Sequence, residues 1–549
     1  MHSSRKGLRL GPVVGHTDDK SSIVWIRVYD DPSRYSLHVE GRGHFSFQGT
    51  EKQDGPPQLL TAVACADKLQ PDRRYSYRVL RDGRTLHDGM GSFRTMPLPG
   101  SMSEMTIVAT SCSAQTEIGL WPQLARFIEQ AQPRCLLLTG DQVYLDDEPS
   151  VWDNYLTKPD DQQRLAMADK YDENWGRDEV RRVLANIPTY MLWDDHEIRD
   201  GWGSIAPDSP TMARQLIEEA AHVSKPRAEK IDAICQRYRR FYMNARHVYW
   251  HFQMSHNPRS IIGDEPESEF AWPMYVRMGR IAVLMVDGRG VRDPWRPVDP
   301  ILGSRQWAAI DAQFEKLRDE PDVDALVVVT QTPLVGMDPE GISQRVIGTR
   351  TDDIELLRRA DAKGLLELNQ TSGSFLPGGA LSAIGAYVNG KTGVQPNIGD
   401  FHLSDIDDCR DQWAYDKARN EQMRLLQRIV EARSTGRPRG QERSVMMLAG
   451  DLHLGARFAI DLKNPSCQLE GIVASGISKH TGETGLTPVI GILLDQDFEV
   501  IPGMHATLKE VVNDCNFAVI QMIPTGGTPQ LQTVLVSAGT PHATSIYAK

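Results

Sequence analysis

Residues 1–98 alternate apolar and polar side chains with a period of two. The alternation is clearest in SSIVWIRVYD (21–30), YSLHVEG (35–41) and RRYSYRVLRDG (73–83). Such alternation is typical of strands that bury one face, and glycine-containing turns separate the segments. The pattern predicts a small β-domain that ends at the linker-like Pro97-Leu98-Pro99-Gly100.

One segment of this domain indicates its type. The run Leu69-Gln70-Pro71-Asp72-Arg73-Arg74-Tyr75 resembles the tyrosine corner of immunoglobulin-like sandwiches. We therefore expect an N-terminal immunoglobulin-like β-sandwich. It carries no recognisable catalytic chemistry, so a structural or substrate-shielding role is the expectation.

From Met105 onward, short apolar runs alternate with amphipathic segments, which is the pattern of a layered α/β fold. The apolar runs are 106–113, 135–144, 190–197, 281–289, 325–333 and 445–453. The helix-like segments are 121–132, 226–246, 305–318 and 413–433, and β-rich runs return from residue 456. We expect residues 102–549 to form one second domain.

Residues 335–411 fit neither pattern. This stretch is rich in glycine and polar residues, with one helix-like run near 353–367. Long segments of this kind are commonly functional loops. We interpret 335–411 as an insertion that lies over the sheet as a lid.

Five of the six apolar runs end in a residue able to bind a metal or an anion. These residues are Cys112, Asp141, Asp195, Asp287 with Arg289, and Asp451 with His453. Ligands of open α/β sheets bind beyond the carboxyl ends of the strands, so we expect these side chains to converge. Clustered carboxylates raise one another's pKa unless cations neutralise them. The pattern therefore predicts a metal site.

Each member of this set also has a simpler interpretation. Cys112 alone would be a small buried hydrophobe, and Tyr144, three residues after Asp141, would be an ordinary aromatic. If both are ligands, thiolate and phenolate favour a strong Lewis acid such as a ferric ion. His196 could instead cap a turn, Asp194 and Glu197 are expected in supporting roles, and Asp146 and Asp147 are expected to be solvated acids at a helix start. His480 is left open.

Composition narrows the function classes. The 549 residues carry a net charge of −12, which argues against a general nucleic-acid binder. Seven scattered cysteines without a C-x-x-C pair indicate reduced thiols and a cytoplasmic protein. No secretory or twin-arginine signal and no transmembrane run is visible. Nucleophile elbows, Walker A loops and dinucleotide-binding fingerprints are also missing from the sequence.

Three short motifs together are specific enough to indicate a protein family. G-D-x-x-Y at Asp141, W-D-D-H-E at Asp195 and G-D-x-H at Asp451 follow one another on successive strand ends. In this order they resemble the metallophosphoesterase superfamily. Ser111-Cys112-Ser113 in place of its first D-x-H block, and Tyr144 in the second block, are similar to the PhoD-like alkaline phosphatase/phosphodiesterase family. The similarity extends to VDGR (286–289), SRQW (304–307) and the opening VVGHTDDKSSIVWIRV (13–28).

The resemblance implies a fold and a set of roles. The fold would be a four-layer α/β/β/α core behind the N-terminal sandwich. Cys112, Asp141 and Tyr144 would hold iron, Asp141 would bridge to a second metal with Asp195, and Asp451 and His453 would complete the shells. His196 would contact phosphate and assist the leaving group, and Arg289 would clamp the phosphate. A ferric ion with calcium ions is the implied metal content, with manganese or zinc as alternatives.

The expected function is metal-dependent hydrolysis of a phosphoric ester, a diester or a monoester, by a metal-activated water or hydroxide. The alternatives are a non-catalytic metal- or ligand-binding protein on the same scaffold and a diesterase of phospholipase D type. We expect a small phosphate ester as substrate and neither nucleic acid nor membrane as partner; the oligomeric state stays open.

Overall fold

The computed structural model describes residues 7–50, 59–204, 208–263, 270–335, 411–414, 417–463, 466–479, 498–523 and 530–538. The predicted lid at 335–411 therefore lies almost entirely outside the described residues, as does His480. Within the described ranges, no helix combines the length and the apolar character that a membrane crossing requires.

The N-terminal region is a sandwich of two antiparallel four-stranded sheets. One has the order β1 (Leu10–Thr17), β2 (Ser22–Arg27), β6 (Thr61–Ala66), β5 (Gln48–Gly49), and the other β4 (Gly43–Ser46), β3 (Tyr35–Val39), β7 (Arg74–Arg81), β8 (Arg84–Arg94). The alternating apolar side chains of both sheets fill one core, which includes Val24, Leu37 and Val79. The hydroxyl of Tyr75 accepts a hydrogen bond of 2.8 Å from the backbone N–H of Gln70, as the tyrosine-corner interpretation requires.

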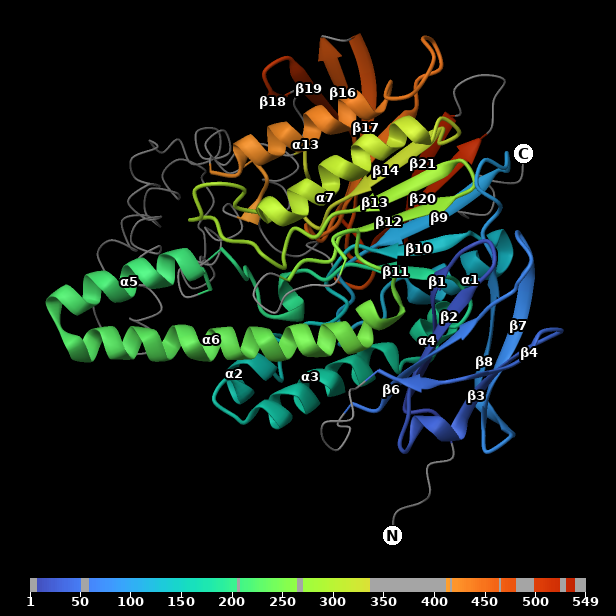
Figure 1. Ribbon diagram of the computed structural model, residues 1–549, viewed down its shortest axis with the longest axis horizontal. Coiled ribbons are helices and arrows are strands. Elements are labelled where there is room, and N and C mark those ends of the chain that lie inside the picture. Colours follow the sequence, from blue (N-terminus) through green and yellow to red (C-terminus); the bar gives the residue numbers. More distant parts are fainter. Residues whose placement is uncertain are drawn as a thin grey trace.

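The sandwich packs closely against the rest of the molecule. Trp25 donates its indole N–H to the carbonyl of His251 at 2.8 Å, and Arg27 pairs with Asp172 at 2.7 Å. The hydroxyl of Tyr190 donates to the carbonyl of Thr17 at 3.0 Å. Figure 1 shows the blue sandwich strands beside α3 (Asp160–Trp175) and α4 (Asp178–Leu184). The division into residues 1–98 and 102–549 stays a prediction.

Two further sheets form the centre of the molecule. The smaller has the order β11 (Thr189–Met191), β10 (Cys135–Leu138), β9 (Met105–Thr110), β20 (Asn516–Ile523), β21 (Gln530–Ser537). The larger has the order β12 (Met274–Met278), β13 (Ile281–Met285), β14 (Ala325–Val329), β15 (Ser444–Ala449), β17 (Ser466–Ala474), β16 (Gly455–Lys463), β19 (Met504–Val512), β18 (Phe498–Ile501). Strands β9, β10 and β11 run parallel, as do β13, β14, β15 and β17.

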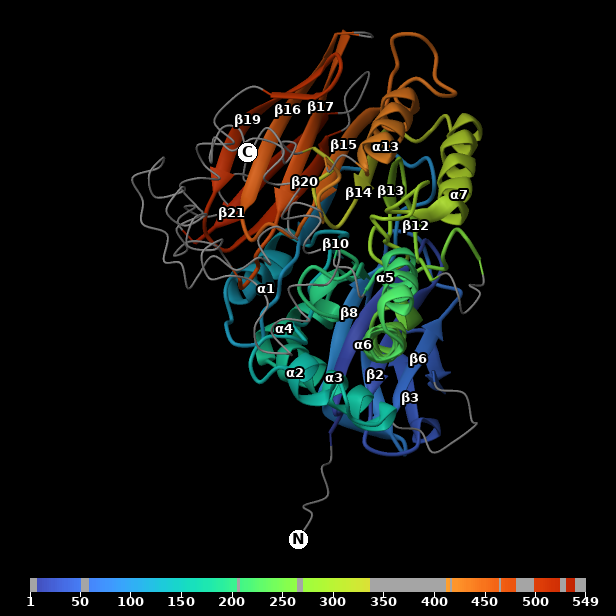
Figure 2. The ribbon, with the colours of Figure 1, turned by 90° about the vertical axis from the view of Figure 1, so that its left-hand side faces the viewer.

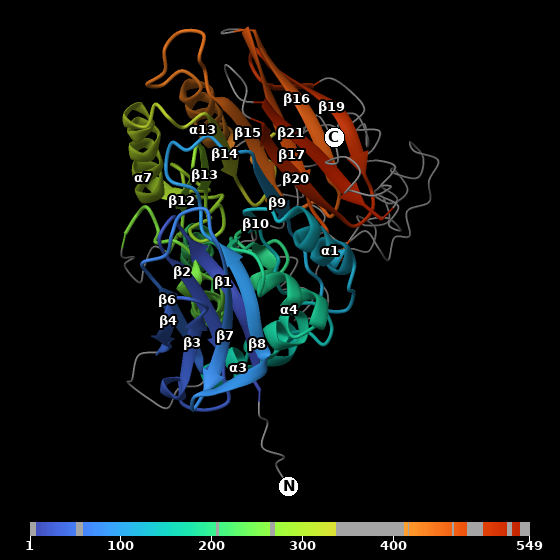
Figure 3. The same ribbon diagram turned by 90° about the vertical axis from the view of Figure 1, so that its right-hand side faces the viewer.

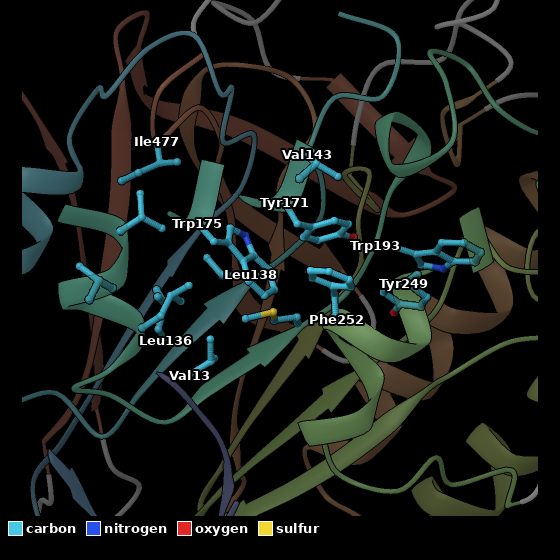
Figure 4. Packing of buried hydrophobic residues seen from close by; sticks show 14 of the residues in the cluster. Val13, Leu136, Leu138, Val143, Tyr171, Trp175, Trp193, Tyr249, Phe252 and Ile477 are labelled. Carbon is cyan, nitrogen blue, oxygen red and sulfur yellow. The ribbon is translucent and has the colours of Figure 1, made fainter. Parts of the chain in front are cut away.

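The strand sequences explain why the two sheets stack. Along β10, Leu136 and Leu138 belong to a cluster with the helices, whereas Leu137 belongs to a cluster shared with the second sheet. Successive side chains of a strand point to opposite faces, so a continuous apolar run buries both. Figure 4 shows Leu136 and Leu138 beside Trp175 of α3 and Phe252 of α6 (Lys225–Phe252).

Helices cover both outer faces. Helices α1 (Trp121–Ala131), α3, α4 and α6 pack on the smaller sheet, and α7 (Gly303–Lys316) and α13 (Arg419–Ala432) pack on the larger one. Figure 3 shows the strands between α7 and α13 on one side and α1 on the other, and Figure 2 gives the view from the opposite direction. The predicted four-layer α/β/β/α core behind a β-sandwich is confirmed.

Two further α-helices lie outside these layers. Helix α2 (Val151–Tyr155) follows the second strand end, and α5 (Pro210–Val223) pairs with α6 in a hairpin that extends from the body in Figure 1. Helices α1, α6, α7 and α13 correspond to the four predicted amphipathic segments, with boundaries shifted by a few residues.

Candidate metal centre

The carboxyl ends of the parallel strands bring the predicted residues together. Strand β9 leads to Cys112, β10 to Asp141, β11 to Asp195 and β15 to Asp451. Ligating atoms of Cys112, Asp141 and His453 lie within 4.8 Å of one another, as do those of Asp141, Asp195 and His196. The convergence expected from the strand pattern is therefore present in the structure.

Glycine lets the loops approach this closely. A Cβ at Gly140 would lie 2.5 Å from the Cβ of Asp194, and a Cβ at Gly450 would lie 2.4 Å from the Thr139 hydroxyl. Real Cβ atoms do not come so near to other atoms, so a larger residue would force the strand-end loops apart. Close packing thus requires both glycines, and Gly140, with a φ of 132°, is required by its backbone conformation as well.

Four candidate ligands occupy the left-handed backbone region. Their φ angles are 56° at Cys112, 55° at Asp141, 71° at Asp451 and 55° at His453. A non-glycine residue in this region costs free energy, and such strain persists where surrounding structure enforces it, commonly at functional sites. The strain is consistent with side chains aimed at a common point.

Cys112, Asp141, Tyr144 and His453 form one side of the cluster. The Tyr144 hydroxyl lies 3.2 Å from Asp141 Oδ2 and 3.0 Å from His453 Nε2, and Cys112 Sγ lies 3.4 Å from the same Asp141 oxygen. Burial, followed by the charge of Asp141, raises the pKa of the Tyr144 phenol, and burial raises the pKa of the Cys112 thiol. Both groups would need a strong positive charge nearby to ionise at neutral pH.

The other side of the cluster consists of carboxylates that lie close to one another, and the protein does not provide a cationic side chain for each of them. Oxygen atoms of Asp194, Asp195 and Asp451 lie within 4.8 Å of one another. Burial and then the Cys112 and Asp195 charges raise the pKa of Asp141 well above its ordinary value. Burial and the Asp195 charge raise the pKa of Asp451 to about 7. Two buried oxygens, Asp194 Oδ2 and Asp195 Oδ1, have no hydrogen-bond donor in the described structure.

The donor atoms of this cluster suit metal ions. Unpaired buried carboxylate oxygens are costly in a protein interior, and a divalent or trivalent cation removes that cost. The donor set contains carboxylates for hard ions and a thiol, a phenol and an imidazole for a transition metal. The residues fit a centre that holds more than one metal ion.

His196 lies at the edge of the cluster. Its ring centroid is 4.2 Å from that of Tyr144, and Nδ1 is 2.8 Å from an oxygen of Asp146. Burial lowers the pKa of His196, but the charges of Asp146 and Asp195 outweigh burial and raise it to about 10. Asp146 thus orients the ring and favours its charged form, and the interpretation of His196 as a turn cap does not account for this pair.

Arg289 is held by protein carboxylates. Nε lies 2.7 Å from Asp194 Oδ1, and Nη1 and Nη2 lie 2.7 and 2.6 Å from the two oxygens of Asp411. The Arg289 side chain is 1% exposed. The structure places the guanidinium behind Asp194, and its expected role as a phosphate clamp stays a prediction.

Asp287 and Glu197 have supporting positions. The Asp287 carboxylate accepts hydrogen bonds from the Trp193 indole and the backbone N–H groups of Arg289 and Gly290. Glu197 accepts from the backbone N–H groups of Asp141 and Asp194, as expected for a structural residue. Both carboxylates are satisfied by N–H donors, so neither needs a metal.

The sequence interpretation missed several residues around the cluster. Asp146 is a partner of His196 and not a solvated acid, and the next helix begins at Val151 with Ser150 as its cap. Asp147 pairs with Lys479 at 3.2 Å. Asp411 stands at the end of a segment without periodic pattern, so no sequence signal marks it. The spacing of Asp146, five residues after Asp141, is the one signal that could have been used.

Comparison with known proteins decides the family. The model of the family described as PhoD-like phosphatase matches residues 107–496, which include all the candidate site residues. The chain belongs to the PhoD-like phosphatase family. It is therefore a phosphoric ester hydrolase with candidate metal-binding groups at its strand ends.

The structure of PhoD supports the fold of this PhoD-like phosphatase. A structure titled "Structure of PhoD" superposes with a TM-score of 0.57 at 15% sequence identity, covering 98% of this chain and 91% of that chain. A purple acid phosphatase from yellow lupin (Lupinus luteus) seeds gives a TM-score of 0.49 at 11% identity, covering 97% of this chain and 72% of that chain. A search of curated proteins found no significant match.

Proposed function

We propose that this PhoD-like phosphatase hydrolyses small phosphate mono- or diesters at a polynuclear metal centre. The observation that carries the proposal is the set of buried, mutually repelling ligand groups that the protein leaves without enough cations of its own. A ferric ion with calcium ions is the proposed content, because a thiol and a phenol lie on one side of Asp141 and carboxylates on the other.

The proposed roles follow from position. Cys112, Asp141, Tyr144 and His453 would hold the ferric ion, and Asp141, Asp195 and Asp451 would hold the hard divalent ions. Metal ions bound there would bind phosphoryl oxygens and lower the pKa of a bound water, so that no side-chain nucleophile is needed.

His196 is the proposed proton donor. The carboxylate of Asp146 accepts from Nδ1 and supports the charged imidazolium, so Nε2 is the nitrogen left to give a proton to the departing ester oxygen. Donation of that proton prevents the build-up of negative charge on the leaving group. Asp146 acts through His196 by fixing its ring and its charge.

Metal analysis combined with two chromogenic esters tests the proposal. The full-length protein would be reconstituted with iron and calcium, or with manganese or zinc, and assayed with p-nitrophenyl phosphate and bis-p-nitrophenyl phosphate. We expect bound metal and turnover of one or both esters, and their kcat/KM ratio assigns the preference. Protein that holds no metal and hydrolyses neither ester under any of these conditions contradicts the proposal.

The two-ester assay and one further substrate, phosphatidylcholine, distinguish two alternatives. A binding-only protein would retain metal without turnover, and the charged His196, whose side chain is 13% exposed, argues against it. A diesterase of phospholipase D type would release choline from phosphatidylcholine. The cytoplasmic setting is also a proposal, supported by six described cysteines that form no disulfide; cell fractionation tests it.

A further inference from the structure

Lys479 stands beside the metal centre on a loop that the structure fixes firmly. The loop follows β17, and the backbone N–H of Ile477 donates to the carbonyl of Ser111 at 2.9 Å. The Ser478 hydroxyl donates to the carbonyl of Ala114 at 3.2 Å, and the N–H of Leu120 donates to the carbonyl of Ile477 at 2.8 Å. The backbone that carries Lys479 is therefore tied to the loop of Cys112.

The side chain of Lys479 reaches the candidate ligands through Tyr144. Its Nζ lies 3.7 Å from the centroid of the Tyr144 ring, whose hydroxyl contacts Asp141 and His453. Nζ also lies 3.2 Å from each oxygen of Asp147. A single aromatic ring thus separates the ammonium from the metal-binding groups.

Exposure distinguishes this cation from the two arginines near the centre. The side chains of Arg289 and Arg292 are 1% and 2% exposed and pair with Asp411, whereas that of Lys479 is 29% exposed. The partner, Asp147, is 32% exposed. Ion pairs exposed to this degree contribute little free energy, so the ammonium can exchange Asp147 for another anion at low cost.

We propose that Lys479 is a substrate-binding residue that contacts the anionic phosphoryl group, with Asp147 holding the ammonium in place until the substrate arrives. The inference rests on the proposed ester hydrolysis and adds a specificity determinant to it. A compact ammonium with three N–H donors interacts with phosphate as a point charge. A phosphomonoester dianion should gain more from Lys479 than a diester monoanion.

Opposite effects of two substitutions test the inference. Lys479→Met removes the cation, and we expect about tenfold weaker binding of inorganic phosphate and about tenfold higher KM for p-nitrophenyl phosphate. kcat should change less than about threefold, because the interaction is made before the chemical step. Asp147→Asn leaves the cation without its competitor and should lower the same KM about twofold. Lys479→Arg should restore most of the phosphate affinity.

A purely structural ion pair predicts a different pattern. In that case Lys479→Met and Asp147→Asn would lower activity to the same extent and change Tm. Neither substitution would change KM separately from kcat. Lys225→Met is the matched control, because Lys225 is an exposed lysine paired with Glu229 on α6, away from the strand ends. Isothermal titration of inorganic phosphate into the metal-loaded, full-length variants gives a readout independent of turnover.

The outcomes separate this inference from the proposed function. If the wild type hydrolyses esters and Lys479→Met has the same KM and the same phosphate affinity as the wild type, the proposed role of Lys479 is overturned and the proposed function stands. If the wild type hydrolyses neither ester but phosphate binding depends on Lys479, the function fails and the binding role stands. A wild type that neither hydrolyses esters nor binds phosphate overturns both.

Discussion

Asp411 and Asp451 are buried or half-buried at the same edge of the two sheets, yet their environments differ. Arg289 and Arg292 surround Asp411 and, against the opposing effect of burial, lower its pKa to about 2. Asp451 faces Asp195 instead, and burial together with that charge raises its pKa to about 7. The protein's own arginines neutralise Asp411, whereas Asp451 is the carboxylate for which we expect a metal cation.

This contrast divides the strand-end residues into two groups. The compensated group consists of Arg289, Arg292 and Asp411, with Asp194 linked to it through Arg289. The less compensated group consists of Asp141, Asp195 and Asp451 with the nearby thiol and phenol; of these carboxylates, Asp195 has a long ion pair of 3.8 Å with Arg289. Sequence position alone does not separate the groups, because Arg289 of the first group follows a strand end just as Asp141, Asp195 and Asp451 of the second do; the number of N–H donors around each carboxylate separates them. Metal binding is expected where those donors are missing.

Removal of one carboxylate of the less compensated group should have the largest effect. Asp141→Asn takes away the group shared by both sides of the centre, so we expect loss of bound metal and a fall in kcat/KM of about a thousandfold or more. In metal-free protein the same substitution should raise Tm, because it relieves repulsion from Asp195. Metal content by mass spectrometry, ester turnover and thermal unfolding measure these effects.

Asp287→Asn is the matched control for this experiment. Asp287 is also a buried strand-end aspartate, but backbone and indole N–H groups already satisfy it. We expect lower stability with metal content retained. Full metal content in Asp141→Asn, or loss of metal in Asp287→Asn, would contradict the division into two groups.

Removal of the cation from the compensated group should damage stability. Arg289→Met leaves Asp194 buried without its cation and leaves Asp411 with Arg292 alone, and breaking a buried ion pair in this way costs about 3–5 kcal/mol. Urea unfolding of the metal-free protein measures the loss. The double variant Arg289→Met with Asp194→Asn should recover part of it, because the stranded carboxylate is gone. A role confined to phosphate clamping predicts unchanged stability and a raised KM.

His196 belongs to neither group: its partner is the carboxylate of Asp146, and its proposed role is proton donation. His196→Gln removes the proposed proton donor, and we expect kcat to fall about a hundredfold with metal content unchanged. Asp146→Asn keeps the ring but removes its charge partner, so a fall of about tenfold is expected. Loss of metal in His196→Gln would make His196 a ligand instead.

The strands, four of the helices and the convergence of the candidate ligands could be predicted from the sequence, because they depend on periodic patterns and short motifs. Parallel strands ending in Cys112, Asp141, Asp195 and Asp451 had to converge at one edge, and they do. Helix α3 was missed because its buried face contains Gln163, Lys170 and Asn174, which interrupt the apolar stripe.

Which buried carboxylates pair with an arginine could not be predicted from the sequence in the same way. The pairing of Arg289 with Asp411 joins residues separated by 122 positions, and no local pattern specifies it. The sequence predicts Asp146 to be a solvated acid at a helix start, whereas in the structure it pairs with His196. Whether a buried acid meets an arginine or another acid depends on how distant loops pack.

The smallest expected effect is a pH dependence of the metal-free protein. The pKa of Asp451 is raised to about 7, so its folded form binds a proton more tightly than the unfolded chain does. The resulting stabilisation is fully present below the unfolded pKa of about 4 and is lost as the pH rises through 7. Chelator-treated protein should therefore lose about 2 kcal/mol of unfolding free energy between pH 5 and pH 8.

The compensated carboxylate provides the internal comparison for this titration. The lowered pKa of Asp411 places its effect below pH 4, outside the window, whereas Glu197, whose pKa burial raises to about 7, titrates inside it. Asp451→Asn should therefore reduce the slope between pH 5 and pH 8 without abolishing it. Bound metal should reduce it too, because cations take the place of the proton on Asp451 and make metal affinity rise with pH. An unchanged slope in Asp451→Asn would mean that Asp451 is better compensated than its neighbours indicate.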